Sequence, residues 1–244
     1  MTRWVQAPAK LNLELSVLGL RSDGTHEVDT VIQAISLKDV LGIDPAQVTT
    51  LAIDGSFPVP AGADNLVLKA AAAIGLTAAF ALTKSIPPGA GLGGGSSDAA
   101  AVLRSTGLPA SELEPIAAGL GADIPFFLHS GRARATGRGE VLLPMAIEEG
   151  WYALAWPGYE VSTAAVYRAW DEVGGEGRNH LFRAACTVEP RLAAFAAELG
   201  DGWVMTGSGS AFFREAPSEA EARIMVAGKE CWTAIATNLA AWPD

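Results

Sequence analysis

The chain has 244 residues, 50% of them hydrophobic, a formal net charge of −10 and a pI near 4.8. This length and hydrophobic fraction allow a sizeable core in one large domain or two modest ones. The acidic balance argues against a nucleic-acid partner or an anionic membrane, because both reward clustered Lys and Arg. Two cysteines are too few for a disulfide scaffold or a zinc cluster.

No targeting or membrane-spanning pattern is visible in the sequence. Residues 1–15 lack a charged region followed by an apolar one, which a signal peptide would show. The longest apolar stretch, Ala70 to Leu82, is shorter than the roughly 20 residues that a spanning helix requires. We therefore expect a cytoplasmic protein with no membrane partner.

Alternating apolar residues predict that the first third of the chain is rich in strands. Helices and strands then follow in mixed order up to Pro144. Asn65 is expected to begin the first helix and Ser111 to cap a later one. The expected strands cover 4–7, 11–17, 31–35, 41–43, 50–53 and 81–86, and the expected helices 65–76, 98–105 and 111–120, before a turn and two strands over 121–144.

The pattern starts again after Pro144. We expect strands at 151–157 and 231–239, helices at 162–173, 190–199 and 218–229, and two strands about a glycine turn within 203–215. Because helices and strands mix without a regular βαβ repeat, the sequence predicts an α+β fold. A boundary between Leu143 and Gly150 predicts two domains, 1–146 and 147–244.

The segment IPPGAGLGGGSSDAAAVL, residues 86–103, places glycines and two serines at the start of an alanine-rich helix. Gly89, Gly91 and Gly94 match the G-x-G-x-x-G pattern of dinucleotide-binding folds, with Glu112 or Glu114 downstream. That pattern normally follows an opening strand of a βαβ unit, whereas a strand-rich segment precedes it here. A Walker loop would need Gly-Lys-Ser/Thr after the glycines, and a nucleophile elbow would need glycine in place of Asp98.

One interpretation of the glycine-rich segment remains, and it rests on the properties of its backbone. Bare backbone N–H groups and two hydroxyls converge at a helix N-terminus, where the helix dipole favours anions. A tight turn with a good helix cap is the structural alternative, but the number of glycines favours a phosphate cradle.

Three segments in order along the chain resemble the motifs of the GHMP kinases, which are small-molecule kinases. Pro87 to Asp98 resembles the central motif, residues 7–15 (APAKLNLEL) the N-terminal one, and residues 205–213 (MTGSGSAFF) the C-terminal one. The resemblance implies a glycine loop that wraps the phosphates of ATP, with Mg²⁺ bound to the ATP. It also implies an N-terminal domain like domain 2 of ribosomal protein S5 and a ferredoxin-like C-terminal domain.

Further segments resemble one branch of this family, which phosphorylates the 2-hydroxyl of a methylerythritol carried on cytidine diphosphate in non-mevalonate isoprenoid biosynthesis. These segments are residues 19–43, 64–71, 120–140 and 161–169. A kinase for mevalonate, homoserine or a sugar is the alternative inside the family, and the segment DGTHEVDT argues against it. A non-catalytic nucleotide-binding protein would keep the loop without needing both Lys10 and Asp123.

Two residues are candidates for catalysis. Asp123 lies in a Gly-Ala-Asp-Ile-Pro turn before two phenylalanines and is suited to accept a hydroxyl proton. As isolated residues, Asp123 would more often cap a helix and Lys10 would more often be a solvated amine. The resemblance implies that Asp123 is the catalytic aspartate and that Lys10 pairs with it and stabilises charge.

The resemblance also implies two sets of binding residues. The ATP set is Asn65, Leu66 and Lys84 near the nucleoside, with Pro87, Pro88, Gly89, Ala90, Gly91, Leu92, Gly93, Gly94, Gly95, Ser96 and Ser97 around the phosphates. The cytidyl-substrate set is Asn12, Thr25, His26, Asp123, Thr163 and Tyr167. No metal ligand is predicted, and the protein is expected to be a monomer or a homodimer.

Two positions depart from the family pattern. Thr25 occupies a place where family members usually carry an aromatic residue that stacks on cytosine, so half of an aromatic sandwich is missing. His180 stands in Asn-His-Leu where Asn-Asp-Leu is typical. We interpret His129 and His180 as structural. The arginines at 132, 134 and 138 are either phosphate contacts or one solvated strand face.

Overall fold

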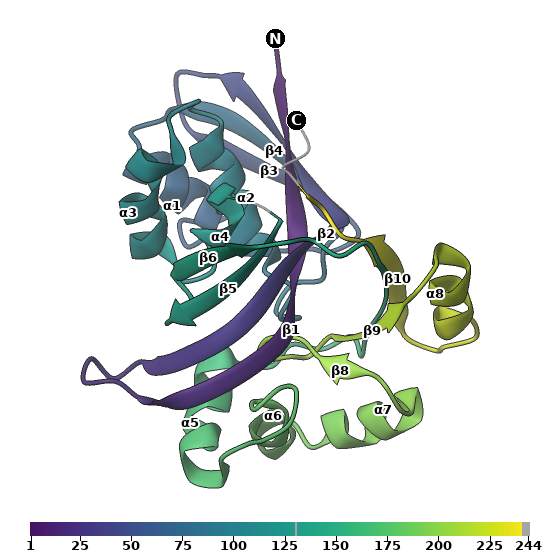
Figure 1. Ribbon diagram of the computed structural model, residues 1–244. Coiled ribbons are helices and arrows are strands. Elements are labelled where there is room, and N and C mark those ends of the chain that lie inside the picture. Colours follow the sequence, from purple (N-terminus) through teal and green to yellow (C-terminus); the bar gives the residue numbers. More distant parts are fainter. Residues whose placement is uncertain (130, 241–244) are drawn as a thin grey trace.

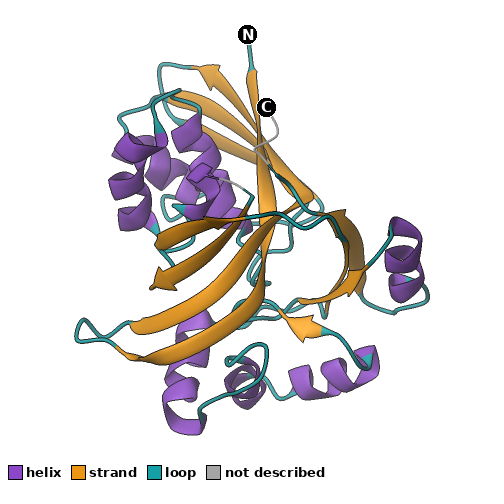
Figure 2. Ribbon diagram, viewed as in Figure 1, coloured by secondary structure: helices purple, strands orange, loops and turns teal. Residues whose placement is uncertain are grey.

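The computed structural model describes residues 1–129 and 131–240, whose strands form two sheets with helices around them (Figures 1 and 2). The first sheet contains β1 (Arg3–Leu20), β2 (His26–Pro45), β3 (Thr50–Gly55), β4 (Ala78–Lys84), β5 (Arg132–Gly137) and β6 (Val141–Met145). The second contains β7 (Trp151–Trp156), β8 (Val204–Met205), β9 (Phe212–Ala216) and β10 (Trp232–Thr237). The predicted α+β class is confirmed.

Strands β1 and β2 form one long antiparallel hairpin, where the sequence predicted four shorter strands. Register shifts occur between Pro8 and Ala9, between Asn12 and Glu14, and between Val17 and Gly19. An extra residue at such a shift bends and twists a strand without ending its pairing. The sequence pattern breaks at these points although the strand continues, which explains the difference.

Strand β2 organises the first sheet because it pairs with three other strands. One edge lies along β1, while the other edge pairs with β5 over Val28–Gln33 and with β4 over Val40–Pro45. Strand β6 extends the sheet beyond β5, and β3 runs parallel to β4. Between its two pairings, β2 leaves a short central segment, and Asp39 lies at the end of it.

Helices α1 to α4 gather beside the first sheet, while α5 to α7 lie below the β1–β2 hairpin and α8 beside the second sheet (Figure 1). Their bounds are α1 (Leu66–Ala73), α2 (Gly94–Arg104), α3 (Ala110–Leu120), α4 (Phe126–His129), α5 (Thr163–Val173), α6 (Phe182–Val188), α7 (Arg191–Leu199) and α8 (Glu219–Val226). Helices α4 and α6 were not predicted. Within the described ranges, no helix has the length and apolar character needed to cross a bilayer.

The structure tests three predicted helix starts: that of α1 is confirmed, and those of α2 and α3 lie earlier than predicted. The Asn65 side chain accepts a hydrogen bond from Val67 N at 2.9 Å, which confirms it as the cap of α1. Helix α2 begins at Gly94 rather than Asp98, because the last glycines and both serines already adopt helical backbone. Helix α3 begins at Ala110 after Pro109 rather than after Ser111, since the fixed φ of proline suits a helix start.

The hydrophobic core is continuous from one sheet to the other. One cluster of buried residues takes Leu11 and Ile35 from the first sheet, Leu92 from the glycine loop, and Leu154 and Phe213 from the second sheet. The chain passes from the first sheet to the second between residues 145 and 151. We propose the domain boundary there, with residues 1–146 and 147–244 as the two domains.

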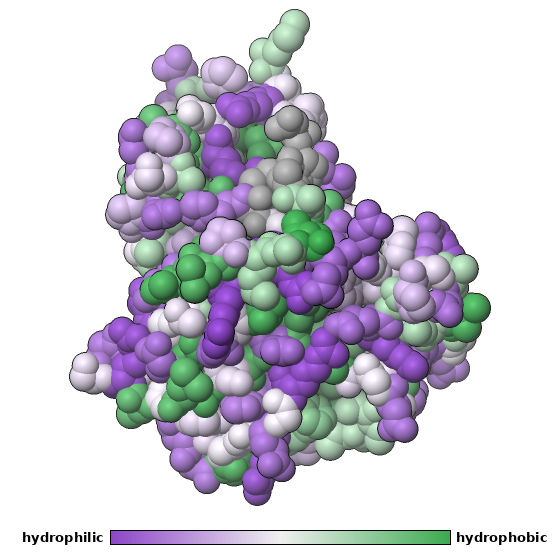
Figure 3. Space-filling model, viewed as in Figure 1, coloured by the Kyte–Doolittle hydropathy of each residue, from purple (hydrophilic) through white to green (hydrophobic). Residues whose placement is uncertain are grey.

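Hydrophilic residues cover most of the face shown in Figure 3, and hydrophobic residues form separate patches between them. The surface on this side of the molecule is therefore mainly polar.

Candidate active site

A cavity of about 510 Å³ is lined mainly by β1, β2, the glycine loop, the Asp123 turn and α5. It collects residues that are far apart in sequence. Most of the predicted site residues line it: Lys10, Asn12, Asn65, Leu66, Lys84, Asp123, Thr163, Tyr167 and every residue from Pro87 to Ser96. Thr25, His26 and Ser97 do not line it.

The glycine loop needs its glycines for close packing as well as for backbone freedom. Gly91 and Gly93 have φ values of +78° and +72°, which L side chains rarely adopt. A Cβ on Gly91 would collide with the carbonyl oxygen of Thr206, and one on Gly93 would lie 3.0 Å from Lys10 Cγ. Gly93 is the N-cap residue of α2, so no side chain caps the helix and its first-turn N–H groups remain available for an anion.

The C-terminal motif lies directly beneath this loop. Ala211 N donates to Ala90 O at 3.0 Å, and Lys10 N of β1 donates to Leu92 O at 2.9 Å. Asn179 Nδ2 donates to the carbonyls of Met205 and Gly207 at 2.6 and 2.9 Å, which fixes the motif from behind. The three motifs that resembled one family in sequence therefore meet in space.

Lys10 and Asp123 form the ionic pair that the resemblance implied. Lys10 Nζ lies 3.7 Å from Asp123 Oδ2, and their side chains are 5% and 38% exposed. Lys10 Nζ also donates to Asn12 Oδ1. A buried ammonium beside a half-exposed carboxylate can neutralise charge while the carboxylate remains accessible to a substrate.

Asn12 is held by neighbours from both ends of the chain. Its Nδ2 donates to Thr30 Oγ1 at 2.8 Å, and its backbone N–H donates to Thr206 Oγ1 at 2.9 Å. Thr30 Oγ1 in turn donates to Glu14 O at 2.5 Å. This series of hydrogen bonds fixes the Asn12 side chain so that its Oδ1 faces Lys10 Nζ.

The lower end of the cavity is formed by helix α5. Thr163 Oγ1 lies 2.7 Å from Ser208 Oγ of the C-terminal motif, so two hydroxyls meet beside the glycine loop. Burial, and secondarily the charge of Asp123, raises the pKa of Tyr167 to about 12. The Tyr167 hydroxyl therefore stays protonated. Gly207 and Ser208 also line the cavity, although we assigned them no role from the sequence.

At the tip of the β1–β2 hairpin, Thr25 and His26 lie outside the cavity lining, and His26 contacts α5. The Thr25 hydroxyl donates to Asp23 Oδ1 at 2.5 Å, and the Thr25 N–H donates to the same oxygen at 2.9 Å. The His26 ring stacks on Tyr167 with centroids 4.8 Å apart, and His26 Nε2 lies 2.8 Å from Asp171 Oδ1.

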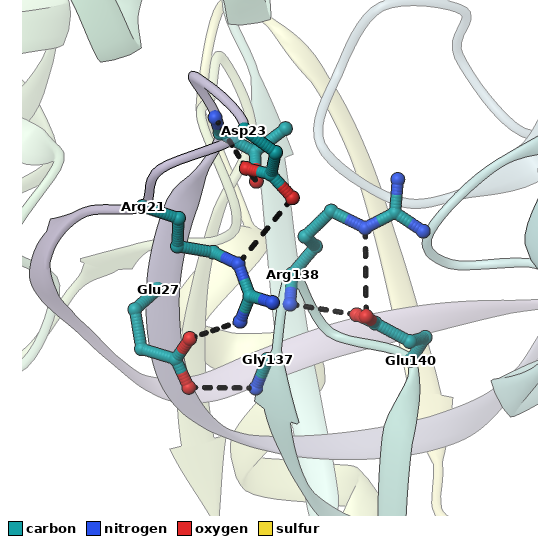
Figure 4. Close-up of polar contacts among 7 residues, drawn as sticks. Arg21, Asp23, Glu27, Gly137, Arg138 and Glu140 are labelled. Atoms are coloured by element: carbon teal, nitrogen blue, oxygen red, sulfur yellow. Dashed lines mark hydrogen bonds and ion pairs between the residues drawn. The ribbon is translucent and has the colours of Figure 1, made fainter.

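Figure 4 shows how this hairpin is joined to the β5–β6 turn. Glu27 accepts from Arg21 on the hairpin and from Gly137 N at 3.2 Å. In the turn, Glu140 accepts from the backbone N–H of Arg138 at 2.6 Å, and Arg138 Nε lies 3.4 Å from Glu140 Oε1. Arg138 lines the cavity, so the phosphate-contact alternative stays open for it.

The other arginines and histidines considered from the sequence have structural partners. Arg132 pairs with Glu148 at 3.0 Å, and Arg134 pairs with Asp29. His129 Nε2 lies 2.6 Å from Glu114. His180 Nδ1 accepts the backbone N–H of Val17 at 3.2 Å, so this departure from the family pattern still joins β1 to the C-terminal half.

Metal ligands are not concentrated anywhere in the part of the chain that the structure describes. No group of three or more His, Cys, Asp or Glu side chains there could hold a metal ion.

Comparisons with known proteins agree with the geometry. The family model of the GHMP kinases N terminal domain matches residues 65–131. The 4-diphosphocytidyl-2-C-methyl-D-erythritol kinase of Rhodococcus jostii (strain RHA1) is 39% identical over 71% of this chain, which spans only 60% of that relative's length. The kinase of the same name from Solibacter usitatus (strain Ellin6076) is 38% identical over 86% of this chain and 79% of its own.

A solved structure is similar over the whole chain. The crystal structure of a 4-(cytidine 5'-diphospho)-2C-methyl-D-erythritol kinase is 36% identical, has a TM-score of 0.77, and is matched over 98% of this chain and 99% of its own. The predicted two-domain GHMP kinase fold is confirmed by this match. The chain belongs to the GHMP kinases and, among them, to the 4-diphosphocytidyl-2-C-methyl-D-erythritol kinase family.

Proposed function

We propose that this chain is an ATP-dependent small-molecule kinase that phosphorylates the 2-hydroxyl of 4-diphosphocytidyl-2-C-methyl-D-erythritol in isoprenoid precursor biosynthesis. The observation that carries the proposal is the cavity, in which the Lys10–Asp123 pair lies beside a glycine loop with an uncapped helix start. Two similar proteins that are named as kinases of this substrate, each matched over most of its own length, support the choice of substrate.

ATP supplies the phosphoryl group, and the loop residues Pro87 to Ser97 hold its phosphates. Their backbone N–H groups and the dipole of α2 attract anions without a lysine in the loop itself. Asn65, Leu66 and Lys84 line the same cavity, and Asn65 and Leu66 would contact the nucleoside, whereas the Lys84 amine is buried against Asp39 and Asp98. Mg²⁺ arrives bound to the phosphates of ATP.

Asp123 accepts the proton of the attacking hydroxyl, and Lys10 orients the Asp123 carboxylate through their ion pair. The positive charge of Lys10 also offsets the negative charge that develops on the transferred group. Asn12 orients Lys10 through their hydrogen bond, so the base, the cation and the amide act as one unit.

The cytidyl diphosphate part extends toward α5 and the hairpin. Thr163 offers a hydroxyl beside the loop, and Tyr167 offers a buried ring beside His26. Thr25 and His26 lie at this end of the site, outside the residues that line the cavity. Cytosine would therefore contact Tyr167 on one side and meet no aromatic side chain at position 25.

Measuring ADP release with four acceptors tests the proposal. The expected result is turnover with the cytidyl substrate and none with mevalonate, homoserine or galactose. Turnover with one of the other acceptors alone would assign a different small-molecule kinase activity. ATP binding without ADP release from any acceptor would support a non-catalytic nucleotide-binding protein instead.

A further inference from the structure

Three ionisable side chains are buried together beneath the glycine loop. Lys84 ends β4, Asp39 lies on β2, and Asp98 lies near the start of α2. Lys84 Nζ donates to Asp39 Oδ2 and, at 2.8 Å, to Asp98 Oδ2. The exposed fractions of the side chains are 4% for Lys84, 0% for Asp39 and 4% for Asp98. We call these three residues the buried triad.

The buried triad connects the entrance of the glycine loop to its exit. Asp39 Oδ1 accepts the backbone N–H groups of Ser85 and Ile86 at 2.6 and 2.9 Å, the two residues that lead into the loop. Asp98 lies one turn inside the helix that the loop enters. Gly94 rests directly on Lys84, since a Cβ there would lie 3.2 Å from Nζ. Lys84 thus bridges both ends of the phosphate-binding segment.

The charges of the triad do not balance when all three groups are ionised. One ammonium faces two carboxylates, which leaves one uncompensated negative charge in a buried place below the loop. Asp39 has three hydrogen-bond donors, whereas Asp98 has only Lys84, and Asp98 Oδ1 has no partner among the described residues. Asp98 is therefore the carboxylate that carries a proton most easily.

The electrostatic environment points the same way. Burial is the main cause that raises the pKa of Asp98 to about 7, with Lys84 opposing it and Asp39 adding to it. Burial opposes the charge of Lys84, but the two carboxylates outweigh it and raise the pKa of Lys84, so the ammonium stays charged.

Several charged groups on the elements packed against α2 have partners of their own, and Glu112 on α3 is exposed. On β1, Lys10 pairs with Asp123; on α1, Lys69 pairs with Asp64; and on α4, His129 pairs with Glu114. Arg104 lies at the far end of α2 itself. The proton balance below the loop is thus set by Asp39, Lys84 and Asp98.

We propose that Asp39 and Asp98 are positioning residues of the ATP site: with Lys84 they hold the glycine loop in shape, and Asp98 takes up a proton when ATP binds. This inference rests on the proposed ATP site. ATP brings several negative charges to the backbone just above the triad, and a neutral triad tolerates them better than a negative one. A ligand that binds one protonation state more tightly shifts the proton equilibrium toward that state.

ATP affinity should fall as the pH rises above about 7. Below about pH 7 Asp98 is already protonated, so its proton does not affect ATP affinity. Above that pH, ATP must bind with uptake of a proton, and its Kd rises by up to about tenfold per pH unit. The rise ends where Asp98 loses its proton in the complex as well.

Titration calorimetry of Mg²⁺-ATP into the full chain between about pH 6 and pH 9 tests the proposal, with Asp98→Asn as the key variant. ATP itself takes up protons in this pH range. Asp98→Asn measures the contribution of ATP alone, because the amide at position 98 does not titrate. We expect the wild-type Kd to rise more steeply with pH than that of Asp98→Asn. We also expect wild type to take up more protons at about pH 8, measured in two buffers of different ionisation enthalpy. Identical pH profiles and proton uptake would overturn the role of Asp98.

Asp39→Asn tests the other carboxylate, with Asp44→Asn on the same strand as a matched control. Asp44 accepts from Thr2 Oγ1 and contacts neither Lys84 nor the loop entrance. We expect Asp39→Asn to weaken ATP at least tenfold at every pH and Asp44→Asn to leave it unchanged. Equal ATP affinity in the two variants would overturn the positioning role of Asp39. If wild type binds no ATP at any pH, the proposed function is contradicted as well. If wild type binds ATP with the same pH dependence as Asp98→Asn, only the proposed proton uptake by Asp98 is contradicted.

Discussion

The two ends of the cavity are built in different ways. The end proposed for ATP centres on one contiguous glycine loop, which is tied at its entrance by buried groups such as Asp39. The end proposed for the cytidyl substrate combines the β1–β2 hairpin, the β5–β6 turn and α5. Glu27 on the hairpin forms a half-exposed pair with Arg21 and accepts the backbone N–H of Gly137. Exposed ion pairs contribute about 0–1 kcal/mol each, whereas buried hydrogen bonds to charged groups contribute more. The first end is therefore rigid, and the second can vary.

The chemistry should fail most severely where the two ends meet. Asp123→Asn removes the proton acceptor while keeping its shape, and should lower kcat roughly 100- to 10,000-fold. ATP affinity should not change, because Asp123 lies outside the loop. Steady-state kinetics with titration calorimetry provide both numbers, and near-normal turnover would remove Asp123 from the mechanism.

A second prediction concerns the rigidity of the ATP end. Gly93→Ala puts a Cβ at φ +72° beside Lys10 and Phe127, and should cost about 1–3 kcal/mol of unfolding free energy. We also expect ATP affinity to fall about tenfold or more, since 1.4 kcal/mol is about tenfold in binding. Denaturant unfolding and ATP titration measure the two effects.

Gly95→Ala is the matched control for this change. A Cβ on Gly95 would meet only Leu66, at an ordinary 3.7 Å, and its φ is not in the left-handed region. It should leave the unfolding free energy unchanged or raise it by up to about 1 kcal/mol, because alanine favours a helix more than glycine does. If both variants lose equal stability, the loop does not need its left-handed glycine.

A smaller effect is expected at the cytidyl end. Thr25→Tyr adds an aromatic ring at the hairpin tip beside His26, whose own ring stacks on Tyr167, and an aromatic pair contributes about 0.5–1.5 kcal/mol beyond area burial. Binding of the cytidyl substrate should tighten about two- to tenfold. Tyr167→Ala should loosen the same substrate, while ATP affinity stays constant in both variants. Unchanged or weaker cytidyl affinity in Thr25→Tyr would mean that cytosine is held elsewhere.

The smallest effect should come from Glu27, which pairs with Arg21 within the hairpin and accepts the backbone N–H of Gly137 at the end of β5. Glu27→Gln removes the charge that Arg21 and Gly137 N share, so the unfolding free energy should change by less than about 1 kcal/mol. Cytidyl-substrate affinity should fall by about two- to threefold, and added salt should reduce the difference between wild type and variant. A larger loss of ATP than of cytidyl affinity would reverse the comparison between the two ends.

What the sequence could predict follows the same division. The glycine loop is a local pattern, so its place at a helix start and its central residues could be read from consecutive letters. The start of α2 was placed too late, because glycine and serine in a first turn do not resemble a helix when read by propensity.

Contacts between distant segments could not be predicted from local patterns. The stacking of His26 on Tyr167 joins two residues far apart in the chain, and the buried triad takes its members from β2, β4 and α2. No periodicity marks Asp39 as buried, because an acidic residue in a strand is ordinarily read as exposed. Thr25 looked like a cavity residue by resemblance, yet its hydroxyl is committed to Asp23.

Identification of the phosphorylated product tests the central claim most directly. Phosphorus NMR of a reaction containing the chain, Mg²⁺-ATP and 4-diphosphocytidyl-2-C-methyl-D-erythritol would follow the substrate's diphosphate and any new phosphomonoester. We predict one new phosphomonoester on the 2-hydroxyl, an intact diphosphate, and loss of this signal in Asp123→Asn. A phosphoryl group on another hydroxyl, or equal product formation by Asp123→Asn, would contradict the account.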